Sequence, residues 1–215
     1  MKLLLALYFL SLPVLAEELY YLTPESVDLS AFAAPPAPDS PQDIADWQAV
    51  LAWQNTRSAL DCERVMVENE GTSTAFYGPP YGPLTQAQSD KLLEMQERLF
   101  DEVNYFARIL KTRWSRPRPF VRDSTITPCI SAHATSGSYP SGHAAIARLS
   151  ALTFSLIHPA QHGAIKDRAK LISEGRVLGG VHYPSDVAAG KRLGDKVFKA
   201  LMKIKTFRTD VNYLK

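Results

Sequence analysis

The amino-acid sequence predicts an all-α protein, folded as a single-domain bundle of helices. Several stretches place apolar residues at steps of three and four, the spacing of one face of a helix, and no stretch alternates in the manner of a half-buried strand. The chain has 215 residues, of which 46% are hydrophobic, and this length and composition suffice for one domain with a sizeable core.

The first 16 residues have the composition of a secretory signal peptide. Lys2 precedes an almost wholly apolar run from Leu3 to Leu15, and Ala16 stands before two glutamates. The run is shorter than the roughly 20 residues that a membrane-spanning helix needs. We therefore expect cleavage after Ala16, a periplasmic or secreted product, and no stable membrane anchor after cleavage.

Residues 17–39 include a Pro-rich run and predict an extended N-terminal arm. The catalytic domain is expected to span 40–215. Ser40 and Pro41 are a helix start, with Ser as the cap and Pro at the first position. Apolar residues from Ile44 to Val65 then roughly follow a helical face, as one long helix or two shorter ones.

The strongest helical signal begins at a capping box formed by Thr85 and Gln88. Lys111 stands at the end of this helix, which Pro117 and Pro119 are expected to stop. Its apolar stripe repeats at three- and four-residue steps and predicts core packing: Leu92, Met95, Leu99, Val103, Phe106 and Leu110.

Three further helices are predicted in the second half of the chain. A polar loop over 121–139 leads to Ser141, a good helix cap, and to a helix that runs to about Ile157. A second helix covers 165–178, and two glycines end it. The last helix opens near His182 and continues to Leu201.

Three short motifs carry groups that suit phosphate chemistry. Together they supply fixed cations for a tetrahedral oxyanion, two histidines, and a carboxylate four residues after the second histidine. This set suffices for phosphoryl transfer through a histidine without metal ligands. The motif residues are Lys111 and Arg118, the Pro-Ser-Gly-His run at 140–143, and Arg176, His182 and Asp186.

The order and spacing of these motifs resemble the signature of the type 2 phosphatidic acid phosphatase superfamily, which includes vanadium haloperoxidases. That signature is Lys, six residues, Arg-Pro; then Pro-Ser-Gly-His; then Ser-Arg, five residues, His, three residues, Asp. One position departs from it, because Gly175 stands where Ser is expected, and Ser173 is out of register. From near Ala34 to Lys191 the chain is most similar to the bacterial class A nonspecific acid phosphatases, which implies their helical fold.

The resemblance also implies a role for each motif residue. His182 would attack phosphorus and form a phosphohistidine, with Asp186 holding its ring, and His143 would act as acid and then base. From residue types alone the two histidines could exchange roles; Asp186 four residues downstream favours His182 as the nucleophile. The residues implied in phosphate binding are Lys111, Arg118, Ser141, Gly142 and Arg176.

We therefore expect a metal-independent acid phosphatase without a cofactor, acting on small-molecule phosphate monoesters, with phosphotransfer to an alcohol as a side activity. The formal net charge is only +2 with both signs interspersed, which argues against a nucleic-acid partner. The alternatives are a vanadium-dependent haloperoxidase and a catalytically inactive periplasmic protein that binds phosphate or phospholipid. The resemblance leaves a homo-oligomer open, and the sequence does not name the physiological substrate.

Two further features concern the loops. In an oxidising compartment we expect Cys62 and Cys129 to form a disulfide, with two separate buried thiols as the alternative. His133 matches no motif position and is interpreted as a solvated loop histidine.

Overall fold

The computed structural model describes residues 19–70, 76 and 83–215. The predicted signal peptide and its cleavage site lie outside these residues. The described residues form helices and no strands, so the all-α prediction is confirmed. The helices are α1 (Pro41–Thr56), α2 (Ala59–Glu70), α3 (Gln86–Trp114), α4 (Pro119–Arg122), α5 (Gly142–Ile157), the 3-10 helix η1 (Pro159–Gln161), α6 (His162–Leu178), α7 (Pro184–Leu201) and α8 (Lys205–Tyr213).

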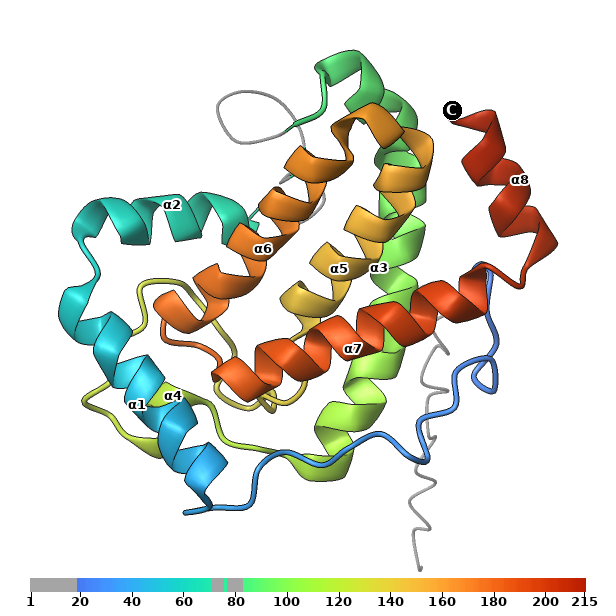
Figure 1. Cartoon of the computed structure of the whole chain (residues 1–215). Coiled ribbons are helices and arrows are strands. Elements are labelled where there is room, and N and C mark those ends of the chain that lie inside the picture. The colour runs from blue at the N-terminus through green and yellow to red at the C-terminus, as the bar shows by residue number, and fades with distance from the viewer. Residues whose placement is uncertain (1–18, 71–75, 77–82) are drawn as a thin grey trace, which may run out of the picture.

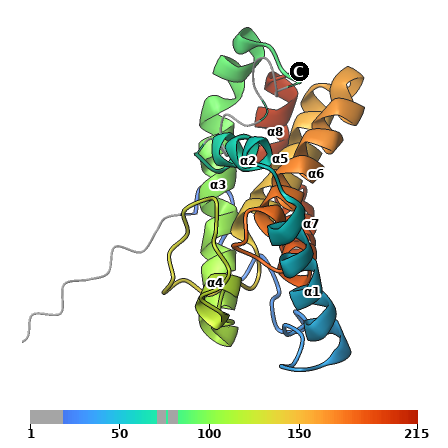
Figure 2. The same cartoon turned by 90° about the vertical axis from the view of Figure 1, so that its left-hand side faces the viewer.

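Helix α5 lies at the centre of the bundle. It contacts α3, α6 and α7, and α7 runs across the lower ends of the other three helices (Figure 1). The view turned by 90° shows α3 on one side of the bundle and α6 on the other (Figure 2). Ten of the residues of α5 are buried, as its nearly all-apolar sequence requires of an interior helix.

Helix α3 forms as its sequence predicts. Thr85 and Gln88 make the reciprocal bonds of a capping box, and all six residues of the predicted apolar stripe are buried. The helix ends at Trp114, where Ser115 adopts a left-handed conformation with φ 43° and donates its N–H to the carbonyl of Lys111. Lys111 therefore lies in the last turn, next to the segment that carries Arg118.

Close packing of α7 against α5 brings two of the motifs together. A Cβ atom at Gly190 would lie 2.3 Å from the carbonyl oxygen of Ser141, and one at Gly194 would lie 2.6 Å from that of Ala145. Only glycine allows such an approach. The N–H of Ser141 also donates to the carbonyl of Asp186 at 3.0 Å. The Pro-Ser-Gly-His loop and the start of α7 are thus neighbours.

The helical pattern after Ser40 forms two helices, because Arg57 has extended backbone between α1 and α2. The predicted apolar face of α1 is confirmed in part, because Trp47 and Leu51 are half-buried and pack against the core, but it is wrong at Ile44. Ile44 is exposed, whereas the buried side chains of α1 are Asp43, Asp46 and Val50. Buried carboxylates need charged or hydrogen-bonded partners, and these come from distant segments described below.

The structure adds elements that the sequence did not predict. The short helix α4 overlaps the predicted loop, η1 and an earlier start extend the segment of α6, and α8 follows α7. Residues 19–40 contain no regular element, yet they bury Tyr21, Leu22, Val27, Leu29 and Phe32 in the core.

A disulfide joins Cys62 of α2 to Cys129, with their Cα atoms 5.6 Å apart, and ties the loop before α5 to α2. In the described part of the chain, every helix is too short or too polar to cross a membrane.

Candidate active site

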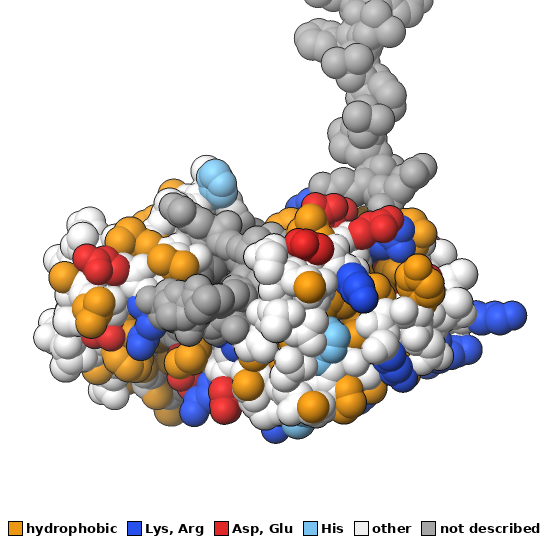
Figure 3. Space-filling view, turned by 90° about the horizontal axis from the view of Figure 1, so that it is seen from above, with side chains coloured by type: hydrophobic (Ala, Val, Ile, Leu, Met, Phe, Trp, Pro, Cys, Tyr) orange, Lys and Arg blue, Asp and Glu red, His pale blue; other side chains and the backbone are white. Residues whose placement is uncertain are grey.

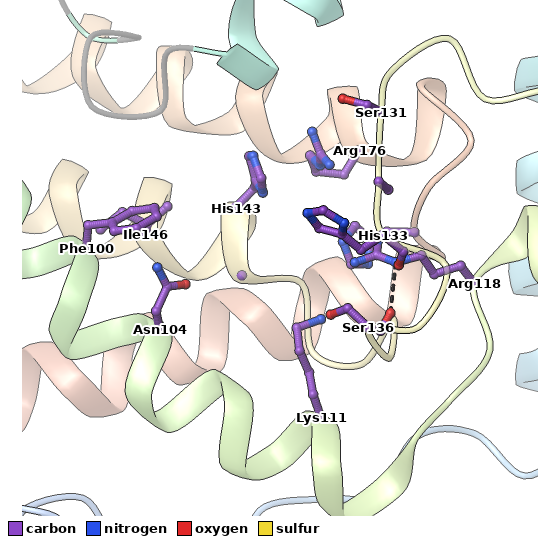
Figure 4. A pocket seen from close by; sticks show the side chains of 13 residues that line it. Phe100, Asn104, Lys111, Arg118, Ser131, His133, Ser136, His143, Ile146 and Arg176 are labelled. Atoms are coloured by element: carbon purple, nitrogen blue, oxygen red, sulfur yellow. Dashed lines mark hydrogen bonds between the residues drawn. The ribbon is translucent and has the colours of Figure 1, made fainter. Parts of the chain in front are cut away.

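A pocket of about 470 Å³ opens between α3, α5, the end of α6 and the loop that precedes α5 (Figure 4). Six of the eight predicted site residues line this pocket. They are Lys111, Arg118, Gly142, His143, Arg176 and His182. The motifs, which are separated by up to 71 positions in the sequence from Lys111 to His182, therefore converge on one cavity.

Three cationic side chains reach the pocket from different elements. Lys111 comes from the last turn of α3 and donates to the carbonyl of Gly137. Arg176 comes from the last turn of α6 and is buried. Arg118 donates from Nε to the carbonyl of Ser136 at 3.0 Å and from Nη1 to that of Val181 at 2.9 Å. These backbone partners fix the guanidinium without neutralising its charge.

Burial has a direct consequence for Lys111. Removal from solvent, reinforced by the nearby Arg118 guanidinium, lowers the pKa of Lys111 to about 7. The side chain therefore carries its full charge in mild acid and loses it as the pH rises through neutrality. An anion bound in the pocket would favour the charged form.

His182 is oriented by bonds to both of its ring nitrogens. Nε2 lies 3.2 Å from Nη1 of Arg118, and Nδ1 lies 3.4 Å from Oδ2 of Asp186. Because a guanidinium can only donate, Nε2 is the acceptor and the neutral ring carries its proton on Nδ1, facing the carboxylate. Burial, together with Arg118, Lys111 and Arg176, holds the pKa of His182 well below its usual value.

Asp186 lies behind His182 and does not line the pocket. Its Oδ2 accepts the N–H of Tyr183 at 2.9 Å, and its Oδ1 accepts from Nη1 of Arg116 at 2.7 Å. Burial raises the pKa of the Asp186 carboxyl, and the Arg116 guanidinium opposes that rise. The arrangement can hold one imidazole tautomer and stabilise positive charge on the ring.

The two halves of the Ser-Gly pair at the start of α5 have different surroundings. Ser141 is fully buried outside the pocket lining, and its hydroxyl caps α5 by accepting from the N–H of Ala144 at 3.4 Å. Gly142 lies on the pocket wall, where a Cβ would meet only Asn104 Oδ1 at 3.7 Å. The N-terminus of α5 therefore faces the pocket through Gly142, and such an end attracts anions.

Figure 4 shows His143 between two unlike ends of the pocket. On one side lie Lys111, Arg118 and Arg176, and on the other lie Phe100 and Ile146, with Asn104 nearby. Sequence reasoning missed Phe100 and Asn104, although both lie on the same face of α3 as Lys111, at spacings of 11 and seven residues.

His133 also needs a correction. It is exposed, as a solvated loop histidine would be, but it lines the pocket, and its carbonyl accepts from Nε of Arg118 at 3.2 Å. His133 matches no motif position that would reveal this. Its loop is brought to the site by the disulfide at Cys129 and by the Arg118 side chain.

The missing motif serine is not replaced by a neighbour. Gly175 is buried in α6, and the hydroxyl of Ser173 donates to the carbonyl of Ala169 at 2.7 Å within the same helix. Ser173 is thus engaged in its own helix. Among the described residues, no group of His, Cys, Asp and Glu side chains is arranged to hold a metal ion.

A buried group of charges behind His182 was not predicted. Arg116 donates to Asp186, and from Nη2 to Asp43 and Asp46 of α1 at 3.0 Å each. Arg122 of α4 donates to the second oxygen of Asp43 at 2.9 Å. The three-residue spacing of Asp43 and Asp46 places both on one face of a helix and could have indicated a shared role. No local pattern in the sequence indicates that Arg116 is their partner.

Comparisons with known proteins agree with this geometry. The chain is 29% identical over 199 residues to a non-specific acid phosphatase of Salmonella typhi, and 30% identical over 199 residues to one of Salmonella typhimurium; each alignment covers 86% of this chain and 78% of the relative. A transmembrane PAP2-type phosphatidylglycerolphosphate phosphatase from Bacillus subtilis shares the fold, with a TM-score of 0.53 and 19% identity over 80% of this chain and 87% of its own. The model of the PAP2 superfamily matches residues 103–210, which hold all eight predicted site residues, and the chain therefore belongs to the PAP2 superfamily.

Proposed function

We propose that this protein is a metal-independent acid phosphatase that hydrolyses phosphate monoesters through a phosphohistidine on His182. The observation that carries the proposal is the orientation of His182, whose Nε2 lies 3.2 Å from Nη1 of Arg118 at the pocket while Nδ1 faces Asp186. The similarity to two non-specific acid phosphatases over most of the chain supports the same reaction class.

The substrate phosphate would lie among Lys111, Arg118 and Arg176, with the N–H of Gly142 as a further donor. A phosphate monoester carries close to two negative charges at neutral pH, and charge-assisted bonds to Arg and Lys are the strongest that a protein can offer it. The same groups would stabilise the charge on the equatorial oxygens of the transition state.

In the first step, Nη1 of Arg118 turns its N–H from Nε2 of His182 to the substrate phosphate. The freed Nε2 attacks phosphorus, and the bond from phosphorus to the ester oxygen breaks. His143 donates a proton to the leaving alkoxide. The proton on Nδ1 stays bonded to Asp186, whose carboxylate stabilises the positive charge that develops on the ring.

In the second step, His143 takes a proton from water, the water oxygen attacks phosphorus, and the P–N bond breaks. Inorganic phosphate leaves and His182 returns to its neutral form. An alcohol in place of water would receive the phosphoryl group, which is the phosphotransferase side activity.

The charges of the site favour mild acid. Because the pKa of His182 is held well below its usual value by burial and the three cations, the nucleophile stays unprotonated there. Lys111, with a pKa of about 7, is charged over the same range. The leaving group would extend past His143 toward Phe100 and Ile146, since the phosphate fills the cationic end.

The proposal is tested by hydrolysis of para-nitrophenyl phosphate from pH 4 to 8 with EDTA present. We expect EDTA-resistant activity that vanadate inhibits and that His182→Ala abolishes. No hydrolysis by the folded wild-type protein would overturn the proposal, and bromide oxidation with vanadate and peroxide would then point to a haloperoxidase.

We further propose that the protein is exported, because residues 1–16 have signal-peptide composition. Expression of the full chain in a Gram-negative host tests this. We expect the activity in the periplasmic fraction and a mature N-terminus at Glu17; an intact N-terminus in the cytoplasmic fraction would contradict export.

A further inference from the structure

The buried charges behind His182 are a distinct feature, and the binding of phosphate in the pocket does not explain them. Arg116 is 7% exposed and lies between α3 and α4, and its side chain does not line the active-site pocket. Its Nη1 donates to Asp186 Oδ1 and to the hydroxyl of Ser185, both at 2.7 Å. Its guanidinium also stacks 4.0 Å from the ring centre of Tyr183.

The other amino group of Arg116 is held by α1. Nη2 donates to Asp43 Oδ1 and to Asp46 Oδ2, and both carboxylates are buried. Asp46 also accepts from the N–H of Ser185 at 3.0 Å and from its hydroxyl, which ties α1 to the first turn of α7. One guanidinium therefore joins three carboxylates from two helices.

We propose that Arg116, held by Asp43 and Asp46, is a positioning residue for the His182 nucleophile. Arg116 binds Oδ1 of Asp186 so that Oδ2 faces Nδ1 of the His182 ring. Asp43 and Asp46 share the charge of Arg116 and so keep Arg116 from neutralising Asp186. This inference rests on the proposed function of His182.

The charge balance explains why the α1 carboxylates matter. If Arg116 paired with Asp186 alone, the two charges would cancel and His182 would face a neutral pair. Because Asp43 and Asp46 share the same guanidinium, Asp186 retains negative charge to stabilise a charged imidazole. Arg122, on Asp43, is the other cation that the structure places in this group.

Helix α1 carries no part of the family signature. Helix α1 lies outside residues 103–210, the part that the superfamily model matches. The family signature includes Asp186, but the carboxylates that set the charge around it come from a helix more than 40 residues earlier than that match.

Other charged and titratable groups also surround His182. They face it from every element around the ring: Lys111 of α3, Arg118 before α4, His143 of α5, Arg176 of α6 and Asp186 of α7. A change confined to α1 leaves all of these in place. An effect on the titration of His182 then comes from the lost Asp46 charge and from its bonds to Arg116 and Ser185.

The test is Asp46→Asn, which keeps the shape of the side chain and removes its charge. We expect kcat to fall by about tenfold, the scale on which outer partners of a functional histidine act, with KM nearly unchanged. The acid limb of the pH profile of kcat/KM should move to lower pH by about half a unit, because Asp186 stabilises the imidazolium less well.

Asp195→Asn is the matched control, because Asp195 pairs with Arg148 in a partly exposed ion pair away from this group. We expect it to leave the acid limb in place. If Asp46→Asn does not fold, Asp43→Asn gives the same readout with the same expected direction.

The outcomes separate the inference from the proposed function. A folded variant with lower thermal stability and an unmoved acid limb would overturn the inference, since a merely structural role predicts that result. Full loss of activity in His182→Ala beside a normal profile in Asp46→Asn would likewise overturn the inference and leave the phosphatase intact. An inactive wild-type protein would instead remove the proposed function itself.

Discussion

Arg116 and Arg118 are two positions apart, and both are buried, yet they lie on opposite sides of His182. Arg118 bonds to backbone carbonyls and faces the pocket, and burial lowers its pKa. Arg116 bonds to three carboxylates; although burial opposes it, those partners raise its pKa. On the pocket side of His182, the charge of Arg118 is therefore available to bind an anion. On the rear side, the charge of Arg116 is balanced by carboxylates, and it stabilises the fold and orients Asp186.

The distribution of charge on the surface differs from that around His182. In the space-filling view, Lys and Arg side chains are scattered among acidic, apolar and uncharged ones, and this face shows no broad patch of one sign (Figure 3). Buried charged side chains, in contrast, gather at the pocket and behind it: Arg118, Arg176, Arg116, Asp43, Asp46 and Asp186.

The largest effect on catalysis is expected on the pocket side, with Arg118→Ala. Loss of this cation should lower kcat/KM by about 1,000-fold, the scale of an arginine that stabilises a phosphoryl transition state. Thermal stability should change little, because Arg118 bonds to the backbone carbonyls of His133, Ser136 and Val181 and not to a carboxylate. Steady-state kinetics measure kcat/KM, and thermal denaturation measures the stability. A variant with lower stability and normal kinetics would contradict the proposed difference between Arg118 and Arg116.

On the rear side, Arg116→Met should act mainly on folding. Removing it leaves three buried carboxylates without their shared cation, and we expect a loss of about 3–5 kcal/mol in the free energy of unfolding. The loss should be smaller at pH 5 than at pH 7. Without Arg116 to oppose it, burial raises the pKa of the Asp186 carboxyl further, so this group takes up a proton as the pH falls and is relieved of its charge. Denaturant unfolding at the two pH values measures this. A loss that is equal at both pH values would show that charge is not its cause.

The pocket side should also set the alkaline limit of activity. Lys111, with its pKa of about 7, loses its proton as the pH rises through that value, so kcat/KM should fall above pH 7. In the substrate complex the bound dianion favours the charged amine, so the corresponding limb of kcat should lie at higher pH.

Lys111→Arg provides the control for that limb, because a guanidinium stays charged throughout the range. We expect it to move the alkaline limb of kcat/KM upward by at least about one unit. A limb that stays in place in the variant would assign the titration to another group.

Ser141→Ala tests whether the Ser141 hydroxyl caps α5 or binds phosphate. As the cap of α5 its hydroxyl should contribute about 1 kcal/mol to stability, and phosphate inhibition should be nearly unchanged. A large loss of phosphate affinity with normal stability would instead support the contact with phosphate that the family signature implies.

The smallest effect is expected at the apolar end of the pocket. Phe100→Ala should lower the preference for phenyl phosphate over glycerol phosphate by about five- to tenfold, because an aromatic leaving group would lose its contact. The ratio of the two kcat/KM values measures this, and an unchanged ratio would place the leaving group elsewhere.

The elements that could be predicted from the sequence are those with local signals. The capping box at Thr85, the stripe of α3 and the cap at Ser141 each depend on residues a few positions apart. The motif residues were identified by their spacing and resemblance, and the structure gathers six of them in one pocket.

What could not be predicted depends on contacts between distant segments. Asp43 and Asp46 look like exposed acids of a surface helix until Arg116 is placed beside them, about 70 positions later. The apolar pattern of α1 therefore found the packed side chains of Trp47 and Leu51 but not the buried carboxylates of Asp43 and Asp46. Likewise, His133 reaches the pocket only because a loop folds over Arg118, which no local pattern reveals.

The central claim, that Nε2 of His182 carries the phosphoryl group, is tested most directly by trapping the intermediate. Purified His143→Ala is mixed with phosphorus-labelled para-nitrophenyl phosphate and quenched in base. The nitrophenolate leaving group needs little protonation, so the first step should proceed without His143. Hydrolysis of the phosphohistidine still needs a base, and therefore the label should accumulate on the variant.

We expect label that is stable in base and labile in acid, on the peptide that contains His182, and none when His182→Ala is added to this variant. Label on another residue, or turnover by the wild-type protein without any trapped label in a rapid quench, would contradict the account.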